Sequence, residues 1–279
     1  MKLKNIIYSV SLCAAALIPV ACDDVAEDDR FIYVEPAEVA KRVLIEDFTG
    51  QWCVNCPDAA ELIELMQDEY GADNVIAVGI YGGNMGKLPN GTPLPLYTET
   101  GDWYYTHWGV TTQPIGMVDR QGLIGTSAWP EAVYNNIQKQ AEIMLEAECA
   151  YDEASRNVGI AVAADGLANI TGSLQVWLVE DSVVSVQLLT GNVTDEEYMH
   201  NHVFRATVNG QMGDDISIIQ GERVEREFTY EISQDWKPEN MSVVAFVYND
   251  TGVLQTAKAK LIPAQGDEKQ PDNDDVEGV

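Results

Sequence analysis

Two cysteines three positions apart are the residues of this sequence best suited to covalent chemistry. Cys53 and Cys56 form a C-x-x-C motif, followed at once by Pro57, between a strand-like and a helix-like stretch. Unpaired N–H groups and the helix dipole at a helix start stabilise a thiolate, which makes Cys53 the expected nucleophile. Cys56 lies further along the turn, where it is placed to resolve a mixed disulfide by closing a short ring.

The C-x-x-C motif has two further interpretations. It is also half of a zinc site, although Cys149 and the three histidines show no spacing that would complete one. A disulfide that only stabilises the turn is the other alternative, and the sequence leaves it open. We expect Cys53 and Cys56 to form a disulfide, and we expect neither a metal ion nor a cofactor.

His200 and His202 form a second candidate pair in the later half of the chain. On a strand, residues two apart project from the same face, so both imidazoles could bind one metal ion. Two ligands without an evident carboxylate partner do not make a site, and a structural or surface role is the expectation.

An aromatic-rich segment, residues 103–108, is a candidate binding surface. Its rings could line a groove near the cysteines that binds a peptide or a glycan. They could equally pack in the core beneath the preceding loop. The sequence leaves both alternatives open.

The elements that must position the cysteines follow from the hydrophobic periodicity of residues 41–150. Strand-like and helix-like patterns alternate there, which favours an α/β domain. A stretch rich in glycine and proline, residues 82–102, is expected to be an inserted loop. The expected strands cover residues 43–48, 75–80, 115–118 and 123–125, the last two as a hairpin. The expected helices cover residues 58–70 and 129–149, each with one apolar face.

The pattern of apolar residues changes in residues 151–264. Short β-type runs follow one another there, with Gly, Asn and Asp clusters between most of them and no long helical pattern. The runs cover residues 158–163, 173–179, 183–189, 226–232, 243–248 and 255–261. This spacing predicts an all-β sandwich domain of the immunoglobulin-like type.

The N-terminus indicates export and a lipid anchor. Lys2 and Lys4 precede an apolar run that is typical of a signal peptide, expected over residues 1–21. Ala21 and Cys22, followed at once by acidic residues, resemble a bacterial lipobox, in which the cysteine carries lipid. Cleavage that leaves Cys22 free is the alternative, although a free cysteine suits an oxidising compartment poorly.

The net charge of the chain argues against some classes of binding partner. Its formal net charge of −29 disfavours nucleic acid and anionic lipid surfaces. The membrane contact is therefore expected through the lipid on Cys22 alone. Polar, acidic sequence at both ends predicts a tether over residues 22–40 and a disordered tail over residues 265–279.

The region of the cysteines resembles the thioredoxin signature. Asp47 stands six residues before Cys53, and Trp52 directly precedes it; Pro114 and Gly122 match the spacing of a cis-proline loop. The resemblance implies that Asp47 is a buried proton acceptor for Cys56. It also implies that Pro114 follows a cis peptide bond and borders a substrate groove.

Nearly the whole chain after residue 21 resembles the 28-kDa outer-membrane protein family of Bacteroidetes lipoproteins. The residues that carry the resemblance are Phe48-Thr49-Gly50-Gln51, Cys53 with Asn55-Cys56-Pro57, Val179-Glu180-Asp181, His200-Asn201-His202-Val203-Phe204-Arg205, Ala245-Phe246-Val247-Tyr248 and Leu254-Gln255. The family implies a surface or outer-membrane lipoprotein, described as an antigen or adhesin. The thioredoxin pattern differs at Thr49-Gly50, which argues against ordinary reductase activity.

These observations predict an α/β thioredoxin-like domain over residues 41–150, followed by the sandwich domain over residues 151–264. The protein is expected at the outer membrane, lipid-anchored, on the periplasmic or the cell-surface side. Thiol–disulfide exchange with a protein partner through Cys53 and Cys56 is the first functional hypothesis. Adhesion or binding of a peptide or glycan ligand, with a structural disulfide, is the alternative.

Overall fold

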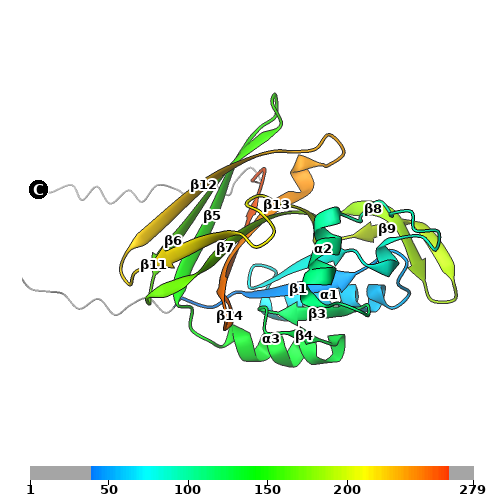
Figure 1. Ribbon diagram of the computed structural model, residues 1–279, viewed down its shortest axis with the longest axis horizontal. Helices are drawn as coiled ribbons and strands as arrows, with labels where there is room; N and C mark the ends of the chain where they lie inside the picture. Colours follow the sequence, from blue (N-terminus) through cyan, green and yellow to red (C-terminus); the bar gives the residue numbers. More distant parts are fainter. Residues whose placement is uncertain (1–38, 264–279) are drawn as a thin grey trace, which may run out of the picture. The chain divides into compact units, whose positions relative to one another are not determined.

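The computed structural model describes residues 39–263 of the 279-residue chain (Figure 1). Strands are the main secondary structure of this part, and they are accompanied by α1 (Cys56–Tyr70), α2 (Glu99–Trp108) and α3 (Trp129–Ile137). No helix within residues 39–263 has both the length and the apolar character needed to cross a bilayer. The expected signal peptide, Cys22, the acidic tail and all but the end of the expected tether lie outside the described residues.

A nine-stranded sheet is the largest element of the described residues. Its strands are β1 (Val43–Thr49), β2 (Val75–Tyr81), β3 (Ile115–Val118), β4 (Leu123–Ile124), β7 (Ile170–Glu180), β10 (Val203–Thr207), β11 (Asp214–Ile218), β13 (Met241–Asn249) and β14 (Gly252–Lys260). They follow the order β14-β13-β7-β10-β2-β1-β3-β4, and β11 pairs with β7 beside this path. β1 and β2 run parallel, β3 pairs antiparallel with β1, and β3 and β4 form the expected hairpin.

The continuity of this sheet corrects the predicted fold class. Strands from both expected domains belong to it, and they meet where Val203 of β10 pairs with Gly79 of β2. The prediction of a thioredoxin-like α/β domain followed by a sandwich is therefore wrong, and the protein is a β-rich fold built on several sheets. Periodicity reveals which face of a strand is buried but not which strand lies beside it. A boundary near residue 150 stays a prediction.

Two smaller sheets complete the described strands. Their strands are β5 (Ile143–Asp152), β6 (Asn157–Gly166), β8 (Val183–Leu189), β9 (Val193–His200) and β12 (Arg223–Glu231). One sheet has the order β12-β6-β5, and the other is the antiparallel β8–β9 hairpin. Figure 1 shows β5, β6 and β12 over β7, β13 and β14, with the three helices gathered around β1 and β3.

The two faces of β1 enter different cores. Val43 and Ile45 pack with α1 and α3, against Trp129. Leu44 and Phe48 point to the opposite face, where aromatic residues of α2, β7, β10 and β13 form a second core. A third, mainly aliphatic core fills the space between the β5–β6–β12 sheet and the strands it covers. Because successive strand residues point to opposite faces, β1 is buried on both sides, as its continuous apolar pattern requires.

Residues 129–149, expected as one helix, form a helix and a strand. α3 ends at Ile137, and β5 begins at Ile143. The apolar residues of the second part fit both a helical and an alternating pattern, and pairing with β6 decides between them. Leu145 lies opposite Ala164 in this pair, and both are buried. The prediction of a continuous helix is therefore wrong beyond Ile137.

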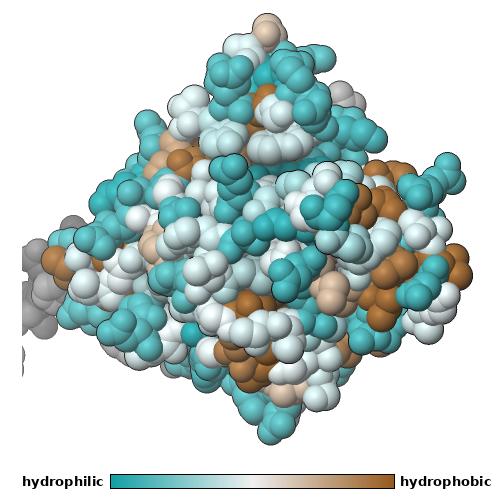
Figure 2. All heavy atoms as spheres, turned by 45° about the vertical axis from the view of Figure 1, so that its right-hand side comes forward, coloured by the Kyte–Doolittle hydropathy of each residue, from teal (hydrophilic) through white to brown (hydrophobic). Residues whose placement is uncertain are grey.

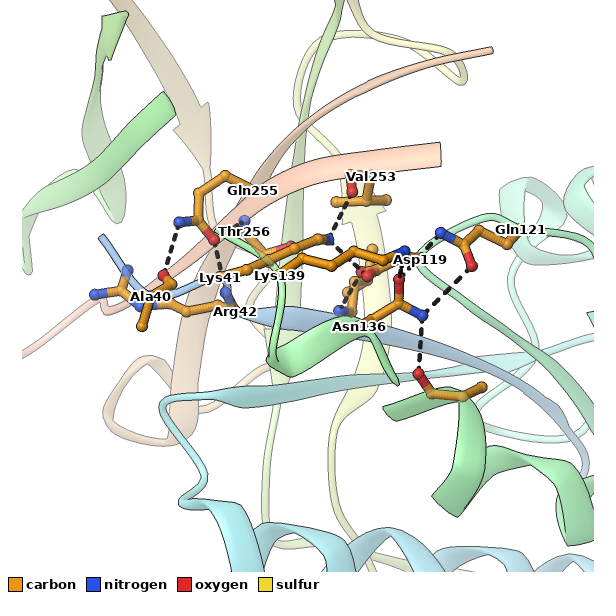
Figure 3. Close-up of polar contacts among 12 residues, drawn as sticks. Ala40, Lys41, Arg42, Asp119, Gln121, Asn136, Lys139, Val253, Gln255 and Thr256 are labelled. Carbon is orange, nitrogen blue, oxygen red and sulfur yellow. Dashed lines mark hydrogen bonds and ion pairs between the residues drawn. The ribbon is translucent and has the colours of Figure 1, made fainter. Parts of the chain in front are cut away.

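A buried ion pair joins the start of β1, the turn after β3 and strand β14 (Figure 3). Lys41 Nζ lies 2.6 Å from Asp119 Oδ2 and donates to the Val253 carbonyl at 2.7 Å. Asp119 Oδ1 accepts from the backbone N–H of Leu44 at 2.9 Å. Burial raises the pKa of Asp119 and lowers the pKa of Lys41, and their mutual attraction opposes both shifts.

Glu46 and Arg120 form a second buried ion pair, on the aromatic side of β1. Arg120 Nη2 lies 3.1 Å from Glu46 Oε1, and Nε lies 3.2 Å from Oε2. The guanidinium lies over the rings of Tyr248 and Phe246, at 4.2 and 4.7 Å from their centroids. Burial raises the pKa of Glu46, and Arg120 opposes that rise. Each partner therefore compensates a charge that would otherwise be buried alone.

Removal of the Arg120 charge is expected to destabilise the fold strongly. Arg120→Met keeps much of the side-chain volume but leaves Glu46 uncompensated, which should lower the free energy of unfolding by about 3–5 kcal/mol. The double variant Arg120→Met/Glu46→Leu should recover a large part of that loss. Urea unfolding checks both, with the exposed Arg223→Ala as a control that should behave like the wild type. Equal stability of Arg120→Met and wild type would contradict the role given to the pair.

Candidate functional site

The two cysteines of the C-x-x-C motif lie between the end of β1 and the start of α1. They form a disulfide, as predicted, with Cα atoms 5.4 Å apart. Cys56 is the first residue of α1, while Cys53 lies in the preceding turn, where its carbonyl accepts from the Cys56 N–H at 3.3 Å. Both residues are almost fully buried, with exposed fractions of 4% and 3%. The pair is thus formed and largely covered.

The loop before Pro114 is attached to the end of β1 and, through Met85, to the cysteine turn. The Gln113–Pro114 peptide bond is cis, as predicted. Gln113 Nε2 donates to the Thr49 carbonyl at 2.5 Å, and its Oε1 accepts from the Met85 N–H at 3.3 Å. Met85 in turn accepts from the N–H of Trp52 at 2.9 Å. These contacts fix the Pro114 loop and the C-x-x-C turn to the same strand end.

Asp47 is buried on the side of β1 that faces α1. Desolvation by burial raises its pKa to about 8, and Oδ1 has no hydrogen-bond partner among the protein groups of residues 39–263. Its carboxyl group borders a cavity of about 50 Å³. Cys56, Tyr81 and His200 line the same cavity. Cys56 and Asp47, which the sequence analysis paired, therefore line the same small cavity.

The β8–β9 hairpin covers the cysteine turn. Gln187 Nε2 donates to the Cys53 carbonyl at 2.9 Å, and the Leu188 N–H donates to the Gln51 carbonyl at 2.8 Å. Gln51 Nε2 returns a hydrogen bond to the Val186 carbonyl at 2.7 Å. Sequence reasoning missed this cover; its one available signal was a glutamine inside the apolar run of residues 183–189.

The β8–β9 hairpin carries exposed apolar residues. Val184 and Met199 are cross-strand partners that are each more than half exposed, and Val193 near the hairpin end is similarly exposed. In Figure 2, which turns the right-hand side of Figure 1 forward, apolar patches stand out from a mostly hydrophilic surface. The cover is thus polar toward the cysteine turn and partly apolar toward solvent.

The two candidate histidines have different partners. His200, at the end of β9, lies 3.0 Å from the Tyr81 hydroxyl through Nδ1, and burial lowers its pKa to about 4. His202 lies in a turn with a left-handed backbone, φ 57°. Its Nδ1 lies 3.0 Å from Asp181 Oδ1, and its Nε2 lies 3.1 Å from Gln67 Oε1. Within residues 39–263, no group of three or more His, Cys, Asp or Glu side chains is arranged to hold a metal ion.

The aromatic segment, residues 103–108, lies on α2 and belongs mainly to the core. Tyr104 and Tyr105 are buried, and the Tyr105 hydroxyl donates to the Thr49 carbonyl at 2.7 Å. Tyr105 also lines an open groove of about 490 Å³, together with Thr112 and Gln113 of the Pro114 loop. Tyr105 therefore both packs in the core and lines a groove, which are the two alternatives left open by the sequence.

The remaining cysteine of the described residues, Cys149, lies on β5 outside the site. It is half-buried and forms no disulfide. Burial raises the pKa of its thiol to about 12. A thiol with such a pKa is a poor nucleophile near neutral pH.

Comparisons with known proteins place this geometry in a wider context. HBP35 of Porphyromonas gingivalis has 15% sequence identity and a TM-score of 0.63, and the match covers 86% of this chain and 79% of that chain. This likeness shows a shared fold. A domain of the outer membrane lipoprotein Omp28 from Porphyromonas gingivalis has 23% identity and a TM-score of 0.32, covering 43% of this chain and 88% of that chain. No curated protein matches the chain.

The sequence match identifies the family. The family described as "Outer membrane protein Omp28" matches residues 101–265, which is more than half of the chain. The chain belongs to the Omp28 family of outer-membrane proteins. The resemblance inferred from the sequence and the expected location at the outer membrane are thereby confirmed.

The raised pKa of Asp47 predicts a pH dependence of stability. Because its pKa of about 8 lies above the ordinary value of 3.8, the folded state binds this proton more tightly than the unfolded chain does. The associated stability is complete below pH 3.8 and is lost as pH rises toward 8. The loss is at most about 1.4 kcal/mol per pH unit.

Asp47→Asn should remove this dependence. Urea unfolding of the oxidised wild type and variant at several pH values across this range isolates it, because all other titrating groups are shared. The stability of the wild type should fall relative to the variant as pH rises. A constant difference between the two proteins would show that Asp47 titrates near its ordinary value.

Proposed function

We propose that this outer-membrane protein exchanges disulfides with other proteins through Cys53 and Cys56. The observation that carries the proposal is the position of Asp47, whose carboxyl group borders the same cavity as Cys56. A buried carboxyl without a protein partner for Oδ1 costs stability. A buried group that has a raised pKa and lines the same cavity as a cysteine is typical of a proton-transfer site.

The proposed exchange starts from the reduced pair. The Cys53 thiolate attacks one sulfur of a partner disulfide, which forms a mixed disulfide and releases one partner thiolate. Cys56 passes its proton to the Asp47 carboxylate, and the Cys56 thiolate attacks Cys53 Sγ. The Cys53–Cys56 bond forms, the second partner thiolate leaves, and two electrons have passed to the partner. Both partner thiolates take up protons from solvent.

The pKa of Asp47 suits this role. A proton acceptor works best when its pKa lies near the working pH, because both protonation states are then accessible. Burial brings Asp47 to about 8, close to the ordinary range of a thiol. The same group would return the proton to Cys56 when exchange runs in the opposite direction.

Exchange requires that the cover over the turn opens. The hairpin is held to the turn by hydrogen bonds from Gln187 to Cys53 and between residues 185–188 and Gln51, and each such bond contributes about 0.5–1.5 kcal/mol. The β8–β9 hairpin is a two-stranded sheet of its own, so it could move without breaking the nine-stranded sheet. We therefore assign the hairpin the role of a gate for partner access.

A second candidate function is favoured by the burial of the pair. A disulfide whose residues are 4% and 3% exposed, tied down by Gln187, suits a purely structural role. The protein would then act as a surface adhesion or ligand-binding lipoprotein. The open groove beside Thr112, Gln113 and Tyr105 is a place where a peptide or glycan could bind.

Trapping of a mixed disulfide separates the two functions. In reduced Cys56→Ser, Cys53 can attack a partner disulfide but cannot be released, so a covalent adduct should accumulate and be seen on a non-reducing gel. Cys53→Ser should form none, and the control Cys149→Ser should behave like the wild type because its thiol is unreactive. Absence of adducts, with equally slow alkylation of Cys53 and Cys56 in the reduced protein, would favour the structural disulfide.

We also propose that Cys22 carries the lipid that binds the protein to the membrane. Metabolic labelling with palmitate should mark the wild type, and Cys22→Ala should abolish the label and release the protein from membranes. Cys13→Ala, within the expected signal peptide, is the matched control and should retain the label. A Cys22→Ala protein that stays labelled and membrane-bound would refute the anchor.

A further inference from the structure

The cavity beside the disulfide contains two groups that the proposed exchange does not use. Tyr81 of β2 and His200 of β9 line it together with Asp47 and Cys56. The Tyr81 hydroxyl lies 3.0 Å from His200 Nδ1, and both residues are buried. Two strands distant in sequence therefore place a hydrogen-bonded polar pair against the thiol site.

Two buried polar atoms of these residues have no protein partner. Asp47 Oδ1 and His200 Nε2 meet no group of residues 39–263 with hydrogen-bond geometry. An unsatisfied buried polar atom costs about 1–3 kcal/mol, so native proteins usually satisfy such atoms with a protein group or a bound molecule. The cavity of about 50 Å³ exceeds the space of roughly 10–15 Å³ that one water molecule needs.

We propose that this cavity is a water site, and that the Tyr81–His200 pair positions its water so that the proton taken by Asp47 can pass between Cys56 and solvent. The inference rests on the proposed disulfide exchange and adds two positioning residues to it. When the Tyr81 hydroxyl donates to Nδ1 of a neutral imidazole, the ring proton resides on Nε2. Nε2–H is then available to donate to a water in the cavity that His200 lines.

The surroundings keep His200 neutral during this step. Burial lowers its pKa to about 4, and the positive charge of Arg205 acts in the same direction. Opposite contributions come from the backbone of Ser185 and Val186 and from Asp195. Several titratable groups face the cavity or the ring from the elements packed around them. They are Asp47 of β1, Cys56 and Glu64 of α1, Tyr81 of β2, Asp195 and Tyr198 of β9, His202 of the turn before β10, and Arg205 of β10. A neutral ring orients water as a dipole and does not itself titrate near neutral pH.

The proton balance of the resolving step defines what the pair does. The Cys56 S–H bond breaks, its proton converts the Asp47 carboxylate to a carboxylic acid, and the thiolate attacks Cys53 Sγ. Asp47 then gives the proton to water in the cavity, which restores the carboxylate for the next turnover. If the water is not held in place, Asp47 gives up its proton more slowly and is less often free to accept the proton of Cys56, so the resolving step slows.

His200→Gln and Tyr81→Phe test the inference, with the exposed His107→Gln on α2 as the matched control. The readouts in the full-length protein are the pH dependence of Cys56 alkylation in the reduced state and the rate of mixed-disulfide resolution. Both cavity variants should slow resolution about tenfold near neutral pH and shift the Cys56 alkylation profile, because loss of the ordered water changes the charge balance between Asp47 and Cys56. His107→Gln should match the wild type. The two variants remove different halves of the pair, so the test survives if one of them fails to fold.

The possible outcomes separate this inference from the proposed function. Wild-type exchange with unchanged profiles and rates in both cavity variants would overturn the water site but leave the exchange in place. Absence of a trapped partner in Cys56→Ser would refute the exchange. In that case the pH dependence of Cys56 alkylation alone tests the water site. A shifted profile in both cavity variants supports the water site, and an unshifted profile overturns it.

Discussion

The arrangement of the sheet depends on Asp119. Its side chain binds Lys41 and the N–H of Leu44, while its backbone binds Leu44 and accepts from the N–H of Val253 at 2.8 Å. One residue thereby fixes the entry of β1, the turn after β3 and the edge strand β14. Because a buried charge without its partners is costly, this joint favours the observed register of segments that are far apart in the sequence. Hydrophobic packing alone would allow more than one arrangement.

The candidate site forms where the two halves of the chain interlock. β1 and α1 supply the cysteines and Asp47, and β10 joins the same sheet beside β2 through Val203 and Gly79. The β8–β9 hairpin directly precedes β10 in the chain, so pairing of β10 brings His200 and Gln187 over the turn. The N–H of Gly79 donates to the His202 carbonyl at 2.7 Å, which adds a backbone hydrogen bond to this junction. The site is thus a product of sheet topology more than of the local motif.

The sequence predicted local features well and long-range pairing poorly. The disulfide and most strands were predicted from residue types and turn signals that lie close together in the sequence. The cis bond before Pro114 was predicted from the resemblance of a short motif. α2 was missed although Thr98, whose hydroxyl accepts from Gly101 N–H, and the left-handed Gly109 mark its two ends. The pairing of β10 with β2 depends on a single register contact and leaves no periodic signal. For the same reason, Tyr81 and Gln187 could not be assigned to the site.

The covering of the disulfide by a distant segment has a consequence for biogenesis. Gln187 lies 134 residues after Cys53, so the hairpin cannot close over the turn until well over half of the chain has emerged. During that interval both thiols are open to oxidants that reach them in the folded protein only when the hairpin opens. The first oxidation state of the pair would then be decided on the emerging chain, before the hairpin controls access to the two sulfurs.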